Sequence, residues 1–106
     1  MDGNAMLSIE WIQNRIKRKE YYFSGHAEQE RRNDNLSISE IKHALLGGVI
    51  LEYYEDTGRG ESCLVAGFTD AGKPIHIVCG ERKAKLIIVT VYIPLPPKFI
   101  TAYERG

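Results

Sequence analysis

Two histidines, His26 and His76, are the residues of this sequence best suited to acid–base chemistry near neutral pH. An imidazole titrates close to neutrality, so one ring can accept a proton while the other donates one. Such a pair would suit the cleavage of RNA by its own 2′-hydroxyl group, a reaction that needs no metal ion. Arg31, Arg32 or Arg59 could then hold the phosphate and stabilise its developing charge.

The same residues also have a purely structural interpretation. His76 lies between two isoleucines and could simply bond to Thr90 or Tyr92, while His26 could simply begin a helix. Tyr92 is a common residue at half-buried strand positions, with its ring packed and its hydroxyl in water. The third histidine, His43, falls on the polar side of a predicted helix and is expected to be exposed. The residue types alone leave both interpretations open.

Other kinds of site have less support in the sequence. A zinc site needs three or four close ligands, and the histidines together with Cys63 and Cys79 show no such spacing. The chain has no nucleophile elbow, no dinucleotide-binding glycine motif after a strand and no phosphate loop. A nucleophilic Cys63 has no local pattern in its favour. We therefore expect neither a metal nor a cofactor.

The elements that must position these residues follow from periodicity and capping. Isoleucines at 9, 12 and 16 have helical spacing, which predicts an N-terminal helix over residues 7–19 after a disordered stretch 1–6. A short β-type segment covers residues 21–24, and His26 opens a polar helix that reaches Asn33. Ser37 and Glu40 form a capping box that starts a further helix, which ends at two glycines.

The rest of the chain reads as β-strand. Four runs, 49–55, 62–69, 74–80 and 86–93, are separated by short turn signals. Connections this short only allow hairpins, so the four strands should form an antiparallel meander. Helices followed by a sheet are an α+β order. We expect one α+β domain over residues 1–106, with N-terminal helices packed on a four-stranded antiparallel sheet.

Strand alternation predicts which side chains share a face of this sheet. The apolar sets expected under the helices are Ile87, Val89, Val91 and Ile93, then Ile75, Ile77 and Cys79, then Leu64, Ala66 and Phe68. His76, Thr90 and Tyr92 then share the opposite face, with Gly67 beside His76. Cys63 falls on that face too, away from Cys79, so the two thiols should stay unbridged.

Composition limits the classes of function. The chain has 106 residues, of which 43% are hydrophobic and 26% charged, so it is a globular domain. Its 14 basic and 14 acidic side chains cancel, which argues against a strongly basic nucleic-acid module and leaves only a local basic patch for RNA. Because it shows neither a membrane span nor a signal peptide, we expect a cytoplasmic protein with reduced cysteines.

The order and spacing of several short motifs resemble a small bacterial family, domain of unknown function 4258. The resemblance covers about residues 21–100. Its motifs are the sequences FSGHA at 23–27, LS at 36–37 with Glu40, GVI at 48–50 leading to Tyr54, SCLVAG at 62–67, GKPIHIV at 72–78 and IVTVYIP at 88–94.

The resemblance implies a fold of the RelE/barnase-like group of ribonuclease toxins. It implies a cytoplasmic toxin of a bacterial toxin–antitoxin pair that cuts RNA without a metal, often encoded beside a zinc-finger-type antitoxin. It also places His26, His76, Thr90 and Tyr92 at the polar motif positions of the family. Two positions differ from many members: this chain has Glu30 where they have arginine and Phe99 where they have tryptophan.

Two hypotheses from different classes follow. The first is an RNA-cleaving toxin, with RNA or the ribosome as its target and an antitoxin as its protein partner. The second is a catalytically inactive protein-binding or regulatory module of the same fold, which the zero net charge and Glu30 favour. A small hydrolase or a metal protein has little positive support. The sequence does not indicate an oligomeric state.

Overall fold

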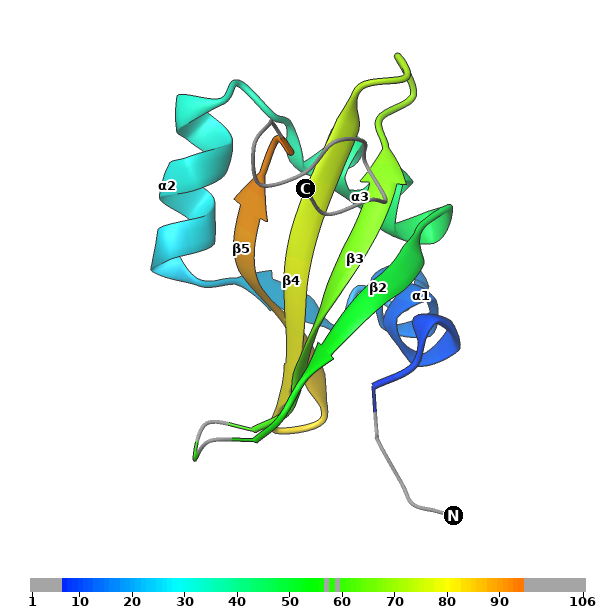
Figure 1. Ribbon diagram of the computed structural model, residues 1–106, viewed down its shortest axis with the longest axis vertical. Helices are drawn as coiled ribbons and strands as arrows, with labels where there is room; N and C mark the ends of the chain where they lie inside the picture. The colour runs from blue at the N-terminus through cyan, green and yellow to red at the C-terminus, as the bar shows by residue number, and fades with distance from the viewer. Residues whose placement is uncertain (1–6, 57, 59, 95–106) are drawn as a thin grey trace.

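Three helices and five strands make up the part of the chain that the computed structural model describes, residues 7–56, 58 and 60–94 (Figure 1). The helices are α1 (Ile9–Lys17), α2 (Gly25–Asn33) and α3 (Ile38–Leu46). The strands are β1 (Tyr21–Phe23), β2 (Val49–Tyr54), β3 (Ser62–Phe68), β4 (Pro74–Arg82) and β5 (Lys85–Tyr92). The predicted α+β order is confirmed.

Each helix begins after a serine whose hydroxyl accepts a hydrogen bond from a backbone N–H in the first turn. Ser37 is one of them, and Glu40 Oε1 in turn accepts the Ser37 N–H at 2.8 Å, which confirms the predicted capping box. A cap of this kind typically stabilises a helix by about 1 kcal/mol. The three pairs, each at 3.0 Å, are Ser8 with Trp11, Ser24 with Ala27 and Ser37 with Glu40.

The five strands form one sheet in the order β1-β5-β4-β3-β2. Strands β2 to β5 are the predicted antiparallel meander. The sheet has one strand more than predicted, because the short segment β1 pairs in parallel with β5, from Tyr21 opposite Leu86 to Phe23 opposite Ile88. The N-terminal part of the chain therefore forms the edge of the sheet next to the last strand.

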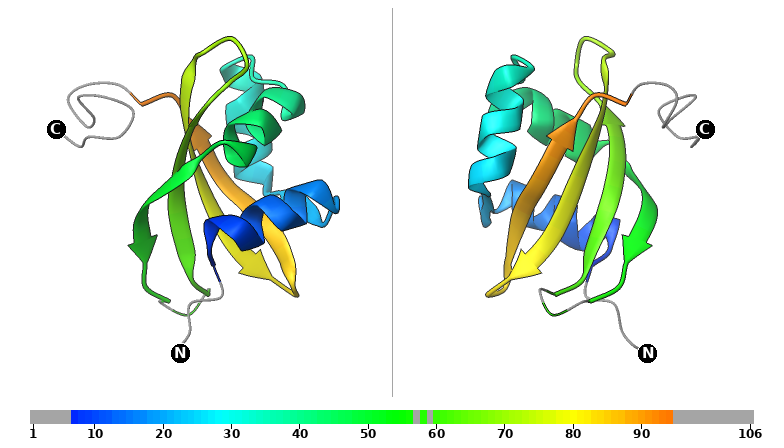
Figure 2. Two further views of the ribbon diagram at one scale, coloured as in Figure 1. Left: turned by 90° about the vertical axis from the view of Figure 1, so that its right-hand side faces the viewer. Right: turned by 60° about the vertical axis from the view of Figure 1, so that its left-hand side comes forward.

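Helices α1 and α3 pack on one face of the sheet, and α2 lies along its edge beside β5 (Figure 2). The buried core fills the space between these helices and the sheet. We call the other side of the sheet the helix-free face. Strand alternation assigns His76 to this face, because its neighbours Ile75 and Ile77 belong to the core.

The structure corrects the predicted facing of β3. Cys63 and Val65 pack with the helices, in place of Leu64 and Ala66. All four side chains are fully buried, so the sequence of this strand carries no polar alternation from which its phase could be read. A shift of one residue exchanges the two faces of a strand.

A bulge corrects the predicted facing of β5. Val78 pairs with Thr90 and Cys79 pairs with Ile88, so Val89 is an extra residue without a partner on β4. The alternation therefore changes phase in the middle of the strand. Leu86 and Ile88 belong to the core in place of the predicted Ile87 and Val89, whereas Val91 lies in the core and Ile93 packs against it, as predicted.

The two cysteines are direct neighbours across β3 and β4, so the prediction that they lie on opposite faces is wrong. Cys63 and Cys79 are paired positions, and both belong to the core beneath the helices. Both are free thiols. Burial raises the pKa of Cys63 to about 12 and raises that of Cys79 well above its ordinary value.

Gly67 is the place where α3 lies directly on the sheet. A Cβ atom at this position would overlap the backbone carbonyl of Ala44, so the helix can approach this closely only because residue 67 lacks a side chain. Gly67 therefore faces α3, and the expectation that it lies beside His76 on the helix-free face is wrong.

Candidate functional site

On the helix-free face, His76 of β4 is paired with Tyr92 of β5. Nδ1 of His76 is 3.2 Å from the hydroxyl oxygen of Tyr92, and the two rings meet edge to face. His76 has no exposed surface, whereas Tyr92 is partly exposed. Thr90 lies opposite Val78 rather than opposite His76. A molecule in solvent would therefore meet Tyr92 before it meets His76.

His26 is the second residue of α2, and its partner lies one turn later on the same helix. Nε2 of His26 is 3.1 Å from Oε2 of Glu30, and the imidazole is about 70% exposed. A carboxylate only accepts hydrogen bonds, so this contact favours the tautomer with hydrogen on Nε2. The Nδ1 atom of an exposed ring then has a lone pair that can accept a proton.

Helix α2 replaces β1 along the outer edge of β5. Strand pairing with β1 ends at Ile88, and the next polar groups of β5 are bonded by side chains of the α2 region. The Ser24 hydroxyl donates to the Val89 carbonyl at 2.9 Å, and Glu30 Oε1 accepts the Val91 N–H at 2.9 Å. Glu30 therefore contacts both His26 and the strand next to the bulge.

The two histidines are held by different partners that meet on β5. His26 contacts Glu30, which binds the backbone of Val91, and the following residue, Tyr92, contacts His76. The pairs occupy three adjoining elements, α2, β5 and β4 (Figure 1). The arrangement places one exposed imidazole beside the sheet edge and one partly exposed phenol on the sheet.

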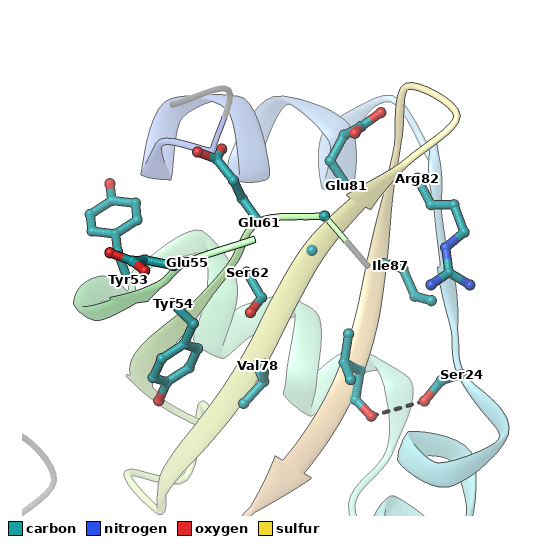
Figure 3. Close-up of a pocket in the computed structure, with 13 residues that line it drawn as sticks. Ser24, Tyr53, Tyr54, Glu55, Glu61, Ser62, Val78, Glu81, Arg82 and Ile87 are labelled. Atoms are coloured by element: carbon teal, nitrogen blue, oxygen red, sulfur yellow. Dashed lines mark hydrogen bonds between the residues drawn. The ribbon is translucent and has the colours of Figure 1, made fainter. Parts of the chain in front are cut away.

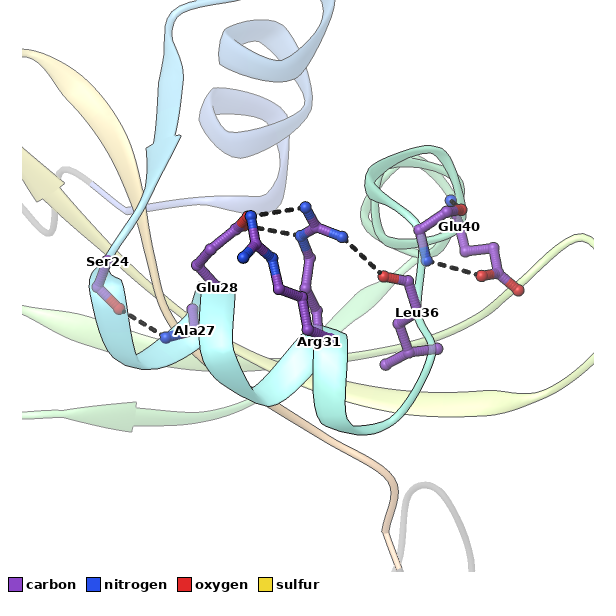
Figure 4. Close-up of polar contacts among 8 residues, drawn as sticks. Ser24, Ala27, Glu28, Arg31, Leu36 and Glu40 are labelled. Atoms are coloured by element: carbon purple, nitrogen blue, oxygen red, sulfur yellow. Dashed lines mark hydrogen bonds and ion pairs between the residues drawn. The ribbon is translucent and has the colours of Figure 1, made fainter.

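The two arginines of α2 share one carboxylate (Figure 4). Arg31 binds both oxygens of Glu28 at 2.7 and 2.8 Å and donates to the Leu36 carbonyl at 3.2 Å. Arg32 reaches Glu28 at 2.9 Å but keeps about two-thirds of its side chain exposed, against 17% for Arg31. Arg31 is thus built into the fold, and Arg32 is the arginine that faces solvent.

The hydrogen bond from Arg31 lowers the pKa of the Glu28 carboxyl group, and both guanidinium charges add to that effect. Glu28 therefore remains charged at neutral pH. The third predicted phosphate-binding residue, Arg59, lies outside the described residues.

A pocket of about 670 Å³ opens on the helix-free face, near the connection between β2 and β3 (Figure 3). Apolar side chains of β4 and β5 line it, together with polar residues that include Tyr54, Ser62 and Arg82. Figure 3 shows Glu61 and Glu81 at one end of the pocket, with Ser24 and Arg82 across from Tyr54. This pocket is not lined by any of the candidate residues that the structure describes, which are His26, Arg31, Arg32, His76, Thr90 and Tyr92.

Sequence reasoning missed the residues that hold the candidate side chains in place. The spacing of His26 and Glu30, four residues apart on a helix, was a signal that could have revealed that pair. The bond from Glu30 to Val91 had no such signal, because it joins residues far apart in the sequence at the point where β1 ends beside β5. Within the described ranges, no group of three or more histidine, cysteine or acidic side chains is placed to hold a metal ion, and no helix is long and apolar enough to cross a membrane.

Comparison with known proteins identifies a family. The family model described as "Domain of unknown function (DUF4258)" matches residues 23–93, which contain α2, α3, β2 to β5 and every candidate site residue. The match confirms the resemblance seen in the sequence, over a somewhat shorter range. Neither the curated proteins nor the solved structures contain a match to the chain.

Proposed function

The chain belongs to the DUF4258 family, and we propose that it is a metal-independent endoribonuclease, acting as the toxin of a bacterial toxin–antitoxin pair with a RelE/barnase-like fold. The observation that carries this proposal is that two contacting pairs, His26–Glu30 and Tyr92–His76, come together on β5. Glu30 binds the backbone of Val91, and Tyr92 is the next residue. One pair offers an imidazole to solvent, and the other offers a phenol.

Because His76 is fully buried, we assign the two proton transfers to His26 and Tyr92. Nδ1 of His26 accepts the proton of the RNA 2′-hydroxyl, and the 2′-oxygen attacks the phosphorus. The Tyr92 hydroxyl gives its proton to the departing 5′-oxygen, so the products are a 2′,3′-cyclic phosphate and a 5′-hydroxyl. His76 positions Tyr92, and Glu30 positions His26. Each such acid or base typically contributes about 10²–10⁴-fold in rate.

The phosphate needs a cation, and Arg32 is the described arginine best placed to supply it. Its guanidinium is exposed and shares Glu28 with Arg31, so it can turn to a phosphate while Arg31 keeps Glu28 in place. Thr90, one residue before Val91 on β5, adds a partly exposed hydroxyl near the Tyr92 pair. RNA or the ribosome is the proposed target, and a cognate antitoxin is the proposed protein partner.

The test is cleavage of a labelled single-stranded RNA in the presence of EDTA, with and without ribosomes. We expect the wild type to leave a 2′,3′-cyclic phosphate, and His26→Ala and Tyr92→Phe each to slow cleavage by at least about 10²-fold. His43→Ala is the matched control, because His43 is an exposed histidine that contacts the Phe68 carbonyl instead. Expression of the wild type should also arrest growth, and the two variants should relieve that arrest.

The alternative is a catalytically inactive protein-binding module of the same fold. It is favoured by Glu28, which occupies both arginines, and by Glu30, which stands where the resembled family often has a cation. Absence of cleavage by the wild type on free RNA and on translating ribosomes would contradict the ribonuclease proposal and favour this alternative. Cleavage that survives both His26→Ala and Tyr92→Phe would show that other residues carry out the proton transfers.

A further inference from the structure

One residue from each strand lies in a single row across the helix-free face, and the middle of this row is hollow. Ser62 pairs with Gly80, and Gly80 pairs with Ile87, so two small residues lie at the centre of the sheet. A Cβ atom built at Gly80 would lie 3.3 Å from a methyl carbon of Ile87 and 3.8 Å from one of Val89, so both side chains share the face of the glycine. From one edge to the other, the row is Tyr54, Ser62, Gly80, Ile87 and Tyr22.

This hollow belongs to the pocket of about 670 Å³ shown in Figure 3. Its floor carries the apolar side chains of Val78, Ile87 and Val89. Tyr54 lies at the β2 side of the pocket, and its hydroxyl donates to Oε1 of Glu52 at 2.8 Å, which holds the ring in place. An apolar floor beside an aromatic ring suits a nucleobase, because every base has a flat face that can stack without a specific hydrogen bond.

Arg82 supplies a positive charge on the same face. It follows Gly80 by two residues on β4, so strand alternation puts both on the helix-free side. Arg82 is exposed, and in the described part of the chain no carboxylate forms an ion pair with it. Glu61 and Glu81 belong by alternation to the helix-covered side, and Figure 3 draws Glu55 pointing away from the floor. An anionic ligand therefore meets a cation here.

The pocket adjoins the residues to which we assign proton transfer. Val78 of its floor lies two residues beyond His76 on β4, so about 7 Å along the strand separates it from the His76–Tyr92 pair. Ser24, which lines the pocket, caps the helix whose second residue is His26. The segment that carries His26 therefore begins at the pocket wall, and Tyr92 lies further along the same face.

From this geometry we propose that the pocket holds the base of the nucleotide whose 2′-hydroxyl attacks, with the RNA running 5′ to 3′ from Arg82 towards Tyr92. The inference rests on the proposed ribonuclease function. His26 takes the 2′-proton of the nucleotide before the cut, and Tyr92 serves the 5′-oxygen of the nucleotide after it. Because the pocket lies on the His26 side, it receives the base before the cut. Arg82 then binds the phosphate on the 5′ side of that base.

The direct test is isothermal titration calorimetry of the full chain with the nucleoside 3′,5′-bisphosphates of the four RNA bases and with the matching 3′-monophosphates. We expect the wild type to bind at least one bisphosphate, and Tyr54→Ala to weaken that binding by about 10-fold, as expected for the loss of one stacked base. Arg82→Gln should weaken binding of the bisphosphate by about 5-fold and leave that of the 3′-monophosphate unchanged, because Arg82 binds only the 5′-phosphate. Circular dichroism shows whether each variant is folded.

Two matched variants make the test specific. Tyr22→Ala is the control for Tyr54→Ala, because the two tyrosines end the same row and are 38% and 37% exposed, but Tyr22 does not line the pocket. Lys73→Gln is the control for Arg82→Gln, because it removes an exposed cation at the other end of β4. Both controls should bind the bisphosphate as well as the wild type does.

The outcomes separate this inference from the proposed function. Unchanged binding of the bisphosphate by Tyr54→Ala would overturn the inference, and so would an equal effect of Arg82→Gln on the bisphosphate and the 3′-monophosphate. A wild type that cleaves RNA but binds no bisphosphate would overturn the inference and leave the ribonuclease in place. Bisphosphate binding with the expected effects of the variants, in a protein that does not cleave RNA, would support the nucleotide pocket and overturn the ribonuclease.

Discussion

Glu30 accepts the backbone N–H of Val91 at 2.9 Å and thereby joins α2 to the bulged part of β5. The other oxygen of the same carboxylate lies 3.1 Å from the His26 imidazole. One acidic side chain thus satisfies a strand that has lost its β1 neighbour and orients a residue of the proposed site. This dual contact explains why glutamate fits at position 30, whether or not the protein is an enzyme.

We predict that Glu30→Ala destabilises the protein by about 1–3 kcal/mol, because it leaves the half-buried N–H of Val91 without an acceptor. Glu30→Gln keeps one oxygen and should recover most of that loss. Gln29→Ala, an exposed neighbour on the same helix, should change the free energy of unfolding by less than about 0.5 kcal/mol. Urea unfolding measures all three variants, and an unchanged stability of Glu30→Ala would show that water replaces the carboxylate.

We predict that the two arginines of α2 have different roles, Arg31 in stability and Arg32 in RNA binding. Arg31→Ala should lower the free energy of unfolding by about 1–2 kcal/mol, since the Leu36 carbonyl loses a charged donor and the guanidinium no longer packs near the Phe23 ring. Arg32→Ala should leave stability nearly unchanged, because its guanidinium is mostly exposed, and should weaken RNA binding instead. Urea unfolding and a filter-binding assay at low salt distinguish the two effects. Equal loss of stability in both variants would contradict the assignment.

We predict that Gly67→Ala destabilises the protein by about 1–3 kcal/mol or more, because its Cβ would collide with the Ala44 carbonyl and push α3 away from the sheet. Gly25→Ala is the control, since no atom lies within 4 Å of a Cβ built there and alanine suits the start of α2 better than glycine does. Thermal unfolding should place the midpoint of the first variant below the wild type. The midpoint of the control should equal or exceed that of the wild type.

We predict that stability falls at alkaline pH because of the two buried thiols. The folded state keeps both protonated, with the pKa of Cys63 at about 12, whereas the unfolded chain releases these protons above about pH 8.5. Deprotonation therefore favours unfolding, and each thiol should cost roughly 1 kcal/mol per pH unit between about pH 9 and 11. The double variant Cys63→Ala/Cys79→Ala should show a shallower decline in urea unfolding at pH 8, 9 and 10. Parallel declines in the two proteins would assign the effect to other groups.

The elements of this fold are predictable because their signals are local. The capping box at Ser37 and the short turns after residue 48 determine a helix and a hairpin meander without reference to the rest of the chain. The fifth strand is harder to predict, since β1 becomes a strand by pairing with a segment more than sixty residues later. Three residues carry too little pattern to specify a distant partner.

The facing of the strands could not be read from the sequence for two physical reasons. On β3, Leu64 and Val65 point in opposite directions and are both buried, so hydrophobicity does not distinguish them. On β5, the bulge at Val89 reverses the alternation between Ile88 and Val91. The candidate site depends on this second feature, because the register beyond the bulge sets Thr90 opposite Val78 and Tyr92 opposite His76.

The position of β5 late in the chain also fixes the order in which the site can assemble during synthesis. His26 and Glu30 leave the ribosome early, but the Val91 backbone that Glu30 binds and the Tyr92 that contacts His76 are among the last described residues to be made. A nascent chain that ends before β5 lacks both the bond from Val91 to Glu30 and the Tyr92–His76 contact, however well its helices have formed. If the protein cleaves RNA, the cell that makes it is exposed to the complete site only once nearly the whole described chain has been translated, which leaves a partner time to engage the growing polypeptide first.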